Sequence, residues 1–328
     1  MRIQRVRLLA PFLSSASSMT PATRWMLIGV QVCFGVFPWL GKVAMEAFEP
    51  RAVLVWRLWA SSAVFLIMAF RIYGRAALPV PRDLLQLFGL SLLGVTFNQV
   101  FFIEGLARST AVNAGLIMVV IPVATVGISA LVGQERASGR QLCGIALSIM
   151  GVVWLFLNRG ATLGEDTRSG DLLMVINAVS YSAYLVLARP MTARLPQLVI
   201  VSWVFFFGAL LCPLIAWDVP WWPAKVGTEQ LLALGGVVIF PTILAYLGTV
   251  VVLSRAGANV TASYVMLQPI LAVLLGVGLL HERPERGLLL TAACVLSGLW
   301  FVSTKAKGER GATQRSEASS PSAADPPK

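Results

Sequence analysis

Polar and aromatic side chains recur along one face of an apolar segment in the middle of the chain. Asn177, Tyr181 and Tyr184 are spaced at i, i+4 and i+7, which places all three on one side of a helix. Amide and phenol groups arranged in this way suit the wall of a path for a polar solute, although Asn and Tyr also hydrogen-bond to neighbouring helices inside bundles. We predict that this face binds a small-molecule substrate.

Comparable side chains occur in other apolar segments. Asn98 and Gln99 are adjacent, and Tyr264 precedes Gln268 by about one helical turn. Trp39 could form an apolar or cation-stacking wall, or could instead anchor its segment at a lipid interface. The further candidates for substrate binding are therefore Trp39, Asn98, Gln99, Tyr246, Tyr264 and Gln268.

Charged residues are rare within the apolar segments, and the most notable are Arg57 and Glu104. A central Arg costs roughly 2.5–3.5 kcal/mol on insertion scales, so its presence indicates a partner or a water-filled space. Arg57 and Glu104 could form a structural ion pair with one another or with Lys42. The alternative is that Glu104 carries a coupling proton while Arg57 or Lys42 meets an anionic group of a solute.

The composition is that of a membrane protein. Of the 328 residues, 57% are hydrophobic and 12% are charged, against about 25% charged residues in soluble domains. The net charge of +11 does not indicate a nucleic-acid partner, because Lys and Arg lie mainly between apolar blocks. With four cysteines, no CxxC pair and one histidine, we expect no metal or other cofactor. The sequence has no hydrolase, metalloprotease or ATP-binding motif, so we expect no enzymatic activity.

The apolar blocks are long enough to cross a bilayer as helices, for which roughly 20 residues are needed. Strands are excluded because open sheet edges cannot be satisfied in hydrocarbon. We predict an all-α integral membrane protein with ten transmembrane helices, at about residues 25–44, 52–71, 84–106, 110–132, 140–157, 171–189, 198–217, 230–252, 258–280 and 286–304.

The second half of the chain repeats the first at an offset of 147 residues. This offset pairs Pro122 with Pro269, and Gly94 with Pro241. The two prolines should kink their helices, because proline lacks a backbone donor, and a weaker irregularity is expected at Gly94 and Pro241. Five helices per copy is an odd number, so the copies should insert with opposite orientation. Inverted repeats give a molecule two near-equivalent states, as alternating access requires.

The repeated segment also resembles a known family. Pro122 followed by Glu135 and by a Gly-containing helix, together with the copy around Pro269 and Glu282, is similar to the EamA-type drug/metabolite transporters. The resemblance covers about residues 25–304. It implies a ten-helix basket with both termini inside the cell, moving amino acids, related metabolites or drugs.

The predicted organisation has four parts, namely a disordered leader (1–22), a first five-helix repeat (23–158), a second five-helix repeat (170–304) and a disordered tail (305–328). Translation could start at Met1 or Met19. Lys and Arg are in excess on the side of the two termini, mainly because of the tails, which places both termini in the cytoplasm and the protein in the cell membrane.

We predict a secondary transporter, with export expected. The alternatives are a lipid flippase and a non-transporting membrane adaptor. The expected partners are the substrate and the lipid bilayer, and a homodimer is one oligomeric state that the sequence allows.

Overall fold

The computed structural model describes residues 20–134, 138–157, 165–264, 267–282 and 288–303, and the elements within them are all helical. Seven helical stretches in this part of the chain are long and apolar enough to cross a membrane, and three shorter apolar helices accompany them. The prediction of an all-α, multi-pass membrane protein is confirmed. The count of ten spans stays a prediction, as do the disordered leader and tail, which lie almost entirely outside the described residues.

The first half of the chain contains α1 (Pro21–Gly35), α2 (Phe37–Ala44), α3 (Pro50–Tyr73), η2 (Gly74–Ala77), α4 (Pro81–Ser91), η3 (Leu92–Thr96), α5 (Phe97–Arg108), α6 (Ala111–Met118), α7 (Val120–Leu131) and α8 (Gly139–Leu157). The second half contains α9 (Glu165–Thr192), α10 (Gln197–Ile215), α11 (Thr228–Val238), η4 (Ile239–Leu244), α12 (Ala245–Tyr264), α13 (Leu267–Gly278) and α14 (Leu288–Ser303). Three helices begin at a proline, which suits the first turn because its missing N–H has no partner there in any case.

Two spans of the first half are interrupted close to a proline. The backbone leaves the regular helix at Val36, two residues before Pro38, and again at Val119, three residues before Pro122. Each break is expected because proline leaves a carbonyl without its helical donor and clashes with the preceding turn. Pro269 lies in the first turn of α13. This helix begins directly after residues 265–266, which lie outside the described part of the chain.

Two further spans each contain a π-helical segment. These segments, η3 and η4, begin at Leu92 and Ile239, which are separated by the same 147 residues as the sequence repeat. Gly94 lies inside the first and Pro241 inside the second, where the sequence suggested an irregularity. Isolated π turns are rare and occur often at functional sites.

One predicted loop is wrong. Residues 253–257 separate two expected spans, but α12 continues as helix to Tyr264. The polar residues of this segment mark where the chain leaves the apolar region, and they include no proline that would end a helix.

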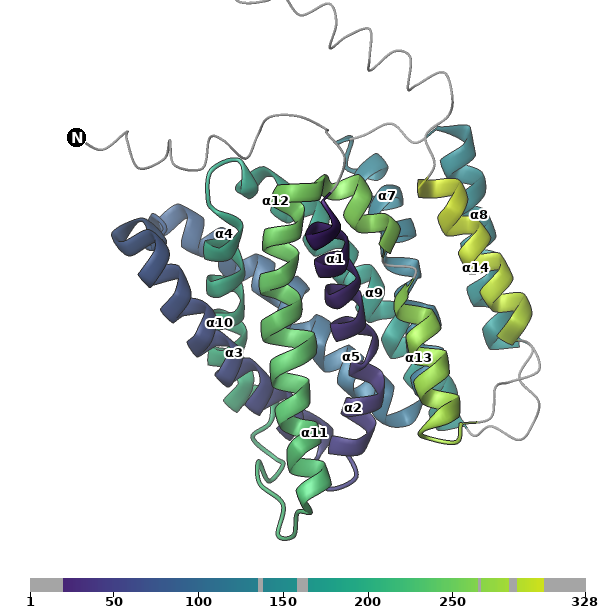
Figure 1. Ribbon diagram of the computed structural model, residues 1–328, viewed down its shortest axis with the longest axis horizontal. Helices are drawn as coiled ribbons and strands as arrows, with labels where there is room; N and C mark the ends of the chain where they lie inside the picture. The colour runs from purple at the N-terminus through teal and green to yellow at the C-terminus, as the bar shows by residue number, and fades with distance from the viewer. Residues whose placement is uncertain (1–19, 135–137, 158–164, 265–266, 283–287, 304–328) are drawn as a thin grey trace, which may run out of the picture.

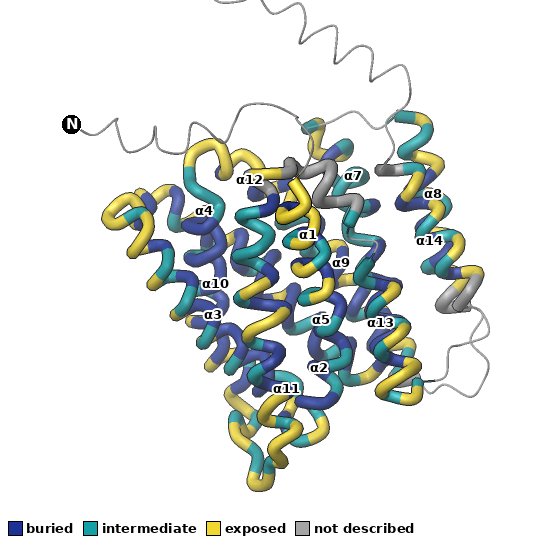
Figure 2. The backbone as a smooth tube through the Cα atoms, in the orientation of Figure 1, coloured by how far each residue is buried: buried dark blue, intermediate teal, exposed yellow. Residues whose placement is uncertain are grey.

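The helices form a bundle in which counterparts from the two repeats pack side by side (Figure 1). Helix α3 lies along α10, and α8 lies along α14 at one edge of the molecule. Small residues allow the α8–α14 contact, since a Cβ at Gly151 would lie 2.8 Å from the Cβ of Cys294. The buried residues concentrate in the interior of the bundle, around α2, α3, α5, α9 and α10 (Figure 2).

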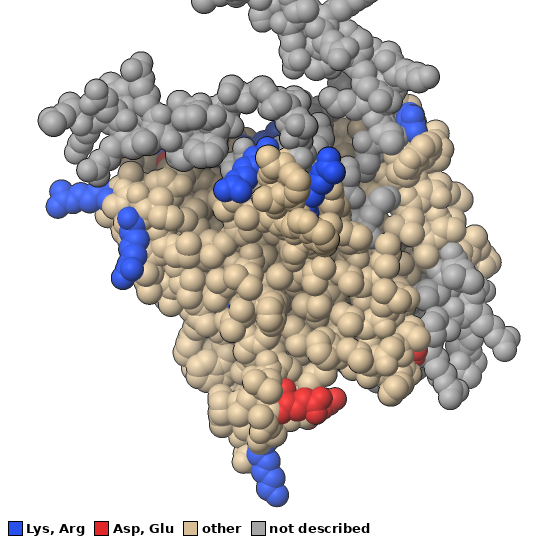
Figure 3. All heavy atoms as spheres, viewed as in Figure 1, with Lys and Arg blue, Asp and Glu red and all other residues tan. Residues whose placement is uncertain are grey.

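The two ends of the bundle differ in charge (Figure 3). We call the end where α1 begins and α14 ends the basic end, and the opposite end the acidic end. Described basic-end residues include Arg24, Arg71, Arg75, Arg82, Arg140, Arg189, Arg194 and Arg255. Described acidic-end residues include Glu46, Glu49, Glu104, Asp218, Glu229 and Glu282, accompanied by fewer cations.

Candidate functional site

Arg57 lies inside the bundle on α3, with 4% of its surface exposed. Its Nε donates to Thr242 Oγ1 at 2.6 Å, and one terminal nitrogen donates to Gln99 Oε1 at 2.5 Å. The guanidinium carbon lies 4.2 Å from the centre of the Phe37 ring. Thr242 belongs to η4, and Gln99 lies in the first turn of α5, which follows η3 directly. Arg57 therefore connects the two π-containing spans through neutral groups.

Hydroxyl groups bond to carbonyl oxygens in or just before the two π segments. Thr242 donates to the carbonyl oxygen of Val237 at 2.9 Å, and Ser180 of α9 donates to that of Leu93 at 2.7 Å. Side-chain donors of this kind compensate the carbonyls that a regular helix would pair with its own N–H groups. The π segments are therefore supported structural features of the interior.

Three tyrosines form a cluster, and one of them, Tyr246, lies within electrostatic range of Arg57. The rings of Tyr181 and Tyr184 stack with centroids 5.6 Å apart, and the hydroxyls of Tyr181 and Tyr246 lie within interaction range. Tyr184 packs directly on Gly94, where a Cβ would lie 2.4 Å from its ring. All three tyrosines remain partly exposed among buried neighbours. The structure thus brings Gln99 and Tyr246 to Arg57, and Tyr181 and Tyr184 to Tyr246.

Asn98 and Asn177 are engaged elsewhere. The side-chain amide of Asn98 donates to the backbone oxygen of Asn177 at 3.1 Å, and the amide of Asn177 donates to the backbone oxygen of Asn98 at 2.7 Å. Both residues are buried. This reciprocal pair of hydrogen bonds joins α5 to α9. The geometry of Asn98 and Asn177 is therefore that of residues that bond neighbouring helices to one another.

The remaining polar candidates are dispersed. Gln268 donates to Gln31 Oε1 at 2.6 Å and thereby joins α13 to α1. Gln31 is itself buried and was missed, because a single Gln in an apolar segment gives no spacing pattern. Tyr264 packs with an apolar cluster around Leu27 on α1, and Trp39 is a partly buried neighbour of the main core.

Glu104 pairs with arginines other than the expected ones. Its carboxylate lies 3.3 Å from Arg51 and 2.9 Å from Arg108, whereas Arg57 makes the neutral contacts described above. Lys42 lies instead within electrostatic range of Glu282. The expectation that Glu104 meets Arg57 or Lys42 is therefore corrected, because Arg51 and Arg108 are nearer on the acidic end.

The same network reaches the loop after α10. Arg51 makes two hydrogen bonds to the carboxylate of Asp218, the shorter of them 2.6 Å long. The bond from Arg51 lowers the pKa of Asp218 from its usual 3.8. This pair fastens the loop to the start of α3.

Asp171 is a further buried acid that the sequence reading missed. It accepts hydrogen bonds from the Ser109 hydroxyl and from the amide of Asn113, which lie at the junction of α5 and α6. The predicted span begins at this residue, and a single acid at the start of a span forms no pattern that would mark it as buried.

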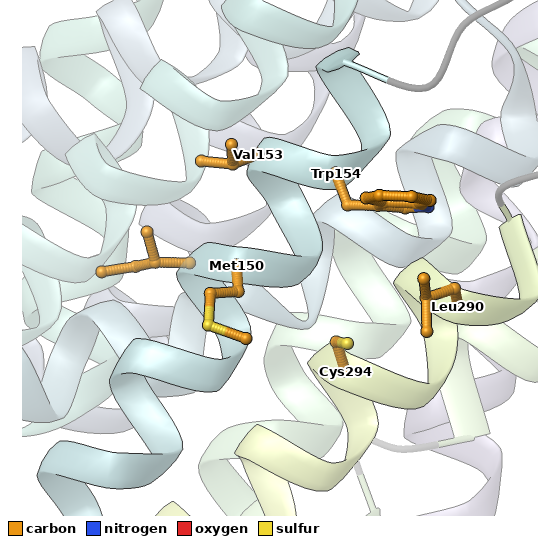
Figure 4. A pocket seen from close by; sticks show the side chains of 6 residues that line it. Met150, Val153, Trp154, Leu290 and Cys294 are labelled. Carbon is orange, nitrogen blue, oxygen red and sulfur yellow. The ribbon is translucent and has the colours of Figure 1, made fainter.

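A groove of about 420 Å³ lies on the outer surface between α8 and α14 (Figure 4). Its wall is almost wholly apolar and consists of Ile149, Met150, Val153, Trp154, Leu290 and Cys294. It offers no group that would recognise a polar solute, and it does not belong to the candidate site. Within the described residues, no cluster of His, Cys, Asp and Glu could hold a metal ion.

A bundle of apolar spans with a buried cation, polar groups and tyrosines in its interior is a multi-pass membrane protein whose interior suits a path for a solute. The chain belongs to the EamA-like transporter family, whose model matches residues 23–157 and again residues 168–304.

Relatives are found in distant organisms. An uncharacterized transporter of Archaeoglobus fulgidus is 26% identical over 267 residues, covering 80% of this chain and 91% of the relative. A WAT1-related protein of Arabidopsis thaliana is 25% identical, covering 67% of this chain and 68% of its own length. A solved crystal structure matches with a TM-score of 0.60 at 22% identity, over 86% of this chain and 97% of that one. This last likeness concerns the fold alone.

Proposed function

We propose that this protein is a secondary transporter that exports a small organic solute with an anionic group, such as an amino acid or a related metabolite. Arg57 carries the proposal, because it is a buried cation whose described hydrogen-bond partners are neutral. Moving an ion into a protein interior costs several kcal/mol unless a counter-charge or good hydrogen bonds compensate it. A carboxylate on the solute would supply that counter-charge and would match the planar guanidinium.

The surrounding groups suit the remainder of such a solute. Tyr181, Tyr184 and Tyr246 offer aromatic faces together with hydroxyl groups, and Gln99 offers an amide. Aromatic side chains bind apolar groups while their hydroxyls fix orientation. This combination fits an amphipathic metabolite or a drug-like compound better than an inorganic ion.

Alternating access is supported by a difference between the repeats. The chain breaks at residues 109–110 between α5 and α6, whereas the repeat counterparts, 256–257, lie within continuous α12. Two copies of one sequence pattern therefore have different conformations. Exchange of these conformations between inverted repeats would open the path first to one side and then to the other.

The excess of Lys and Arg at the basic end supports an orientation in which this end, and with it both termini, faces the cytoplasm. The proposed location is the cell membrane. A lipid flippase or a membrane adaptor is less favoured, because neither function needs a buried arginine among tyrosines. A homodimer stays a prediction. Proton coupling through Glu104 stays the alternative to a purely structural role in its ion pairs with Arg51 and Arg108.

The first experiment compares the intact protein with Arg57→Met in a bacterial host, with metabolites profiled inside and outside the cells. Arg194→Met is the matched control, because Arg194 pairs with Asp83 at the exposed basic end. We expect an anionic solute to accumulate outside with the intact protein and the control, but not with Arg57→Met at equal membrane abundance. Export that is undiminished in Arg57→Met would exclude the assigned role of Arg57.

A further inference from the structure

Glu282 makes a contact that joins the two repeats at the acidic end. One carboxylate oxygen accepts from the backbone N–H of Ala111 at 2.7 Å, and the other accepts from that of Val112 at 3.0 Å. These are the first two N–H groups of α6, which have no partner within the helix. Thr110 accepts from the N–H of Asn113, so side chains satisfy three N–H groups of this turn.

The local backbone directs Glu282 back toward α6. His281 has a positive φ of 54°, and the N–H of Glu282 returns to the carbonyl of Gly276 at 3.0 Å. A Cβ at Gly276 would lie 2.8 Å from both the Glu282 carboxylate and the Val112 side chain. The absence of a side chain at this position therefore makes room for the carboxylate between α13 and α6.

The helices α6 and α13 also pack closely one turn further into α6. A Cβ at Gly115 would lie 2.3 Å from the Cβ of Ala272, so the two helices touch nearly backbone to backbone. Lys42 of α2 adds a cation within electrostatic range of Glu282. Two helices of the first repeat are thus linked to the end of α13 in the second.

We propose that Glu282 is a gate residue, and that its bonds to the N-terminus of α6 hold the acidic end of the solute path closed. The proposal rests on the alternating access argued above. Opening this end requires α6 and α13 to separate, and the separation breaks both carboxylate bonds. Because opening admits water, the freed N–H groups and the freed carboxylate become hydrated. Breaking this contact therefore costs less free energy than breaking a pair in the dry interior, where the groups would be left without partners.

Sided thiol labelling tests the proposal. All four native cysteines are replaced by Ala, and Phe34→Cys is introduced as the reporter, because Phe34 contacts Tyr246 in the interior. The full chain is reconstituted in vesicles and treated with a membrane-impermeant maleimide from either side. Glu282→Ala is compared with the parent and with Glu229→Ala, a matched change at the same end on α11.

We expect Glu282→Ala to raise the labelling rate from the acidic side at least tenfold and to lower it from the basic side, with Glu229→Ala unchanged. Equal labelling of a folded Glu282→Ala variant and its parent would overturn the gate and leave Glu282 as a helix cap alone. Labelling reports conformation without transport, so a sided response with no transported solute would count against the proposed function and not against the gate.

A second test covers the case in which Glu282→Ala does not fold. Val112→Cys and Val273→Cys in the cysteine-free chain place two thiols across the α6–α13 contact, because Val273 packs against the cluster of Val112 and Leu116. Oxidation should stop transport, and reductant should restore it. Undiminished transport by the cross-linked protein would overturn the proposal.

Discussion

Replacing Gly94 by Ala should disturb the candidate site through one methyl group. The new Cβ would lie 2.4 Å from two ring carbons of Tyr184, against the usual carbon–carbon contact of about 3.5–4.0 Å. The ring must therefore move by about 1 Å, and overpacking of this kind costs roughly 1–3 kcal/mol. Replacing a helical Gly by Ala returns about 1 kcal/mol, so the net loss of stability is about 0–2 kcal/mol.

Gly89→Ala is the matched control on the preceding helix, α4. No atom lies within 4 Å of a Cβ at Gly89, so only the propensity gain applies there. We expect Gly89→Ala to raise the thermal midpoint in detergent slightly and to leave the KM for the transported solute unchanged. Gly94→Ala should lower the midpoint relative to this control and raise the KM, because Tyr184 stacks on Tyr181.

A double-mutant cycle isolates the contact. In a Tyr184→Ala background, the added methyl of Gly94→Ala no longer meets the ring, and the cost of that contact should disappear. If Gly94→Ala matches Gly89→Ala in both midpoint and KM, or if its cost persists without the Tyr184 ring, the assignment of this contact is refuted.

Three further outcomes are expected. Asn177→Ala should lower stability by about 1–2 kcal/mol, the scale of interhelical hydrogen bonds in membranes, with an unchanged KM in transport assays, whereas Tyr181→Ala should raise the KM. Glu104→Gln should leave the pH dependence of transport unchanged, because the carboxylate already forms ion pairs with Arg51 and Arg108. Loss of the pH dependence in this variant would instead identify Glu104 as the coupling group. Pairing with Arg51 lowers the pKa of Asp218 in the folded protein. The pair therefore stabilises the loop at a pH above the unfolded pKa, and this stabilisation is lost as the pH falls through the folded pKa, which lies below 3.8. Tryptophan fluorescence of the loop should show this acid transition in the intact protein and not in Asp218→Asn.

The architecture was accessible from the sequence because lipid imposes one rule on every span, namely that apolar helices satisfy their own backbone. Irregular turns were also accessible where Gly94, Pro241 and Pro122 disturb that rule. Pro38 is likewise a proline inside an apolar segment, and its effect was overlooked. The regular helix α1 ends at Gly35, three residues before it. The extent of α12 was missed because hydropathy measures where a span leaves the apolar region, whereas helix can continue beyond it.

Pairing between side chains was much less accessible. Arg57, Gln99 and Tyr246 were each suspected, and their convergence depends on how the two π segments face one another. The partners of Glu104 depend on which arginine of neighbouring helix ends lies nearest, and spacing along one helix cannot supply that information. Asp171 and Gln31 are single polar residues whose partners belong to other helices, so no periodic pattern marks them.

The two π segments also have a mechanical consequence. A π turn accommodates an extra residue, and because one residue of an α-helix corresponds to about 100° of rotation, it sets the facing of every side chain that follows. If η3 or η4 tightened to regular helix, Gln99 or Tyr246 would rotate away from Arg57 together with the rest of its helix. A local change in the winding of either π segment would therefore rotate both the proposed solute contact and the far end of the span.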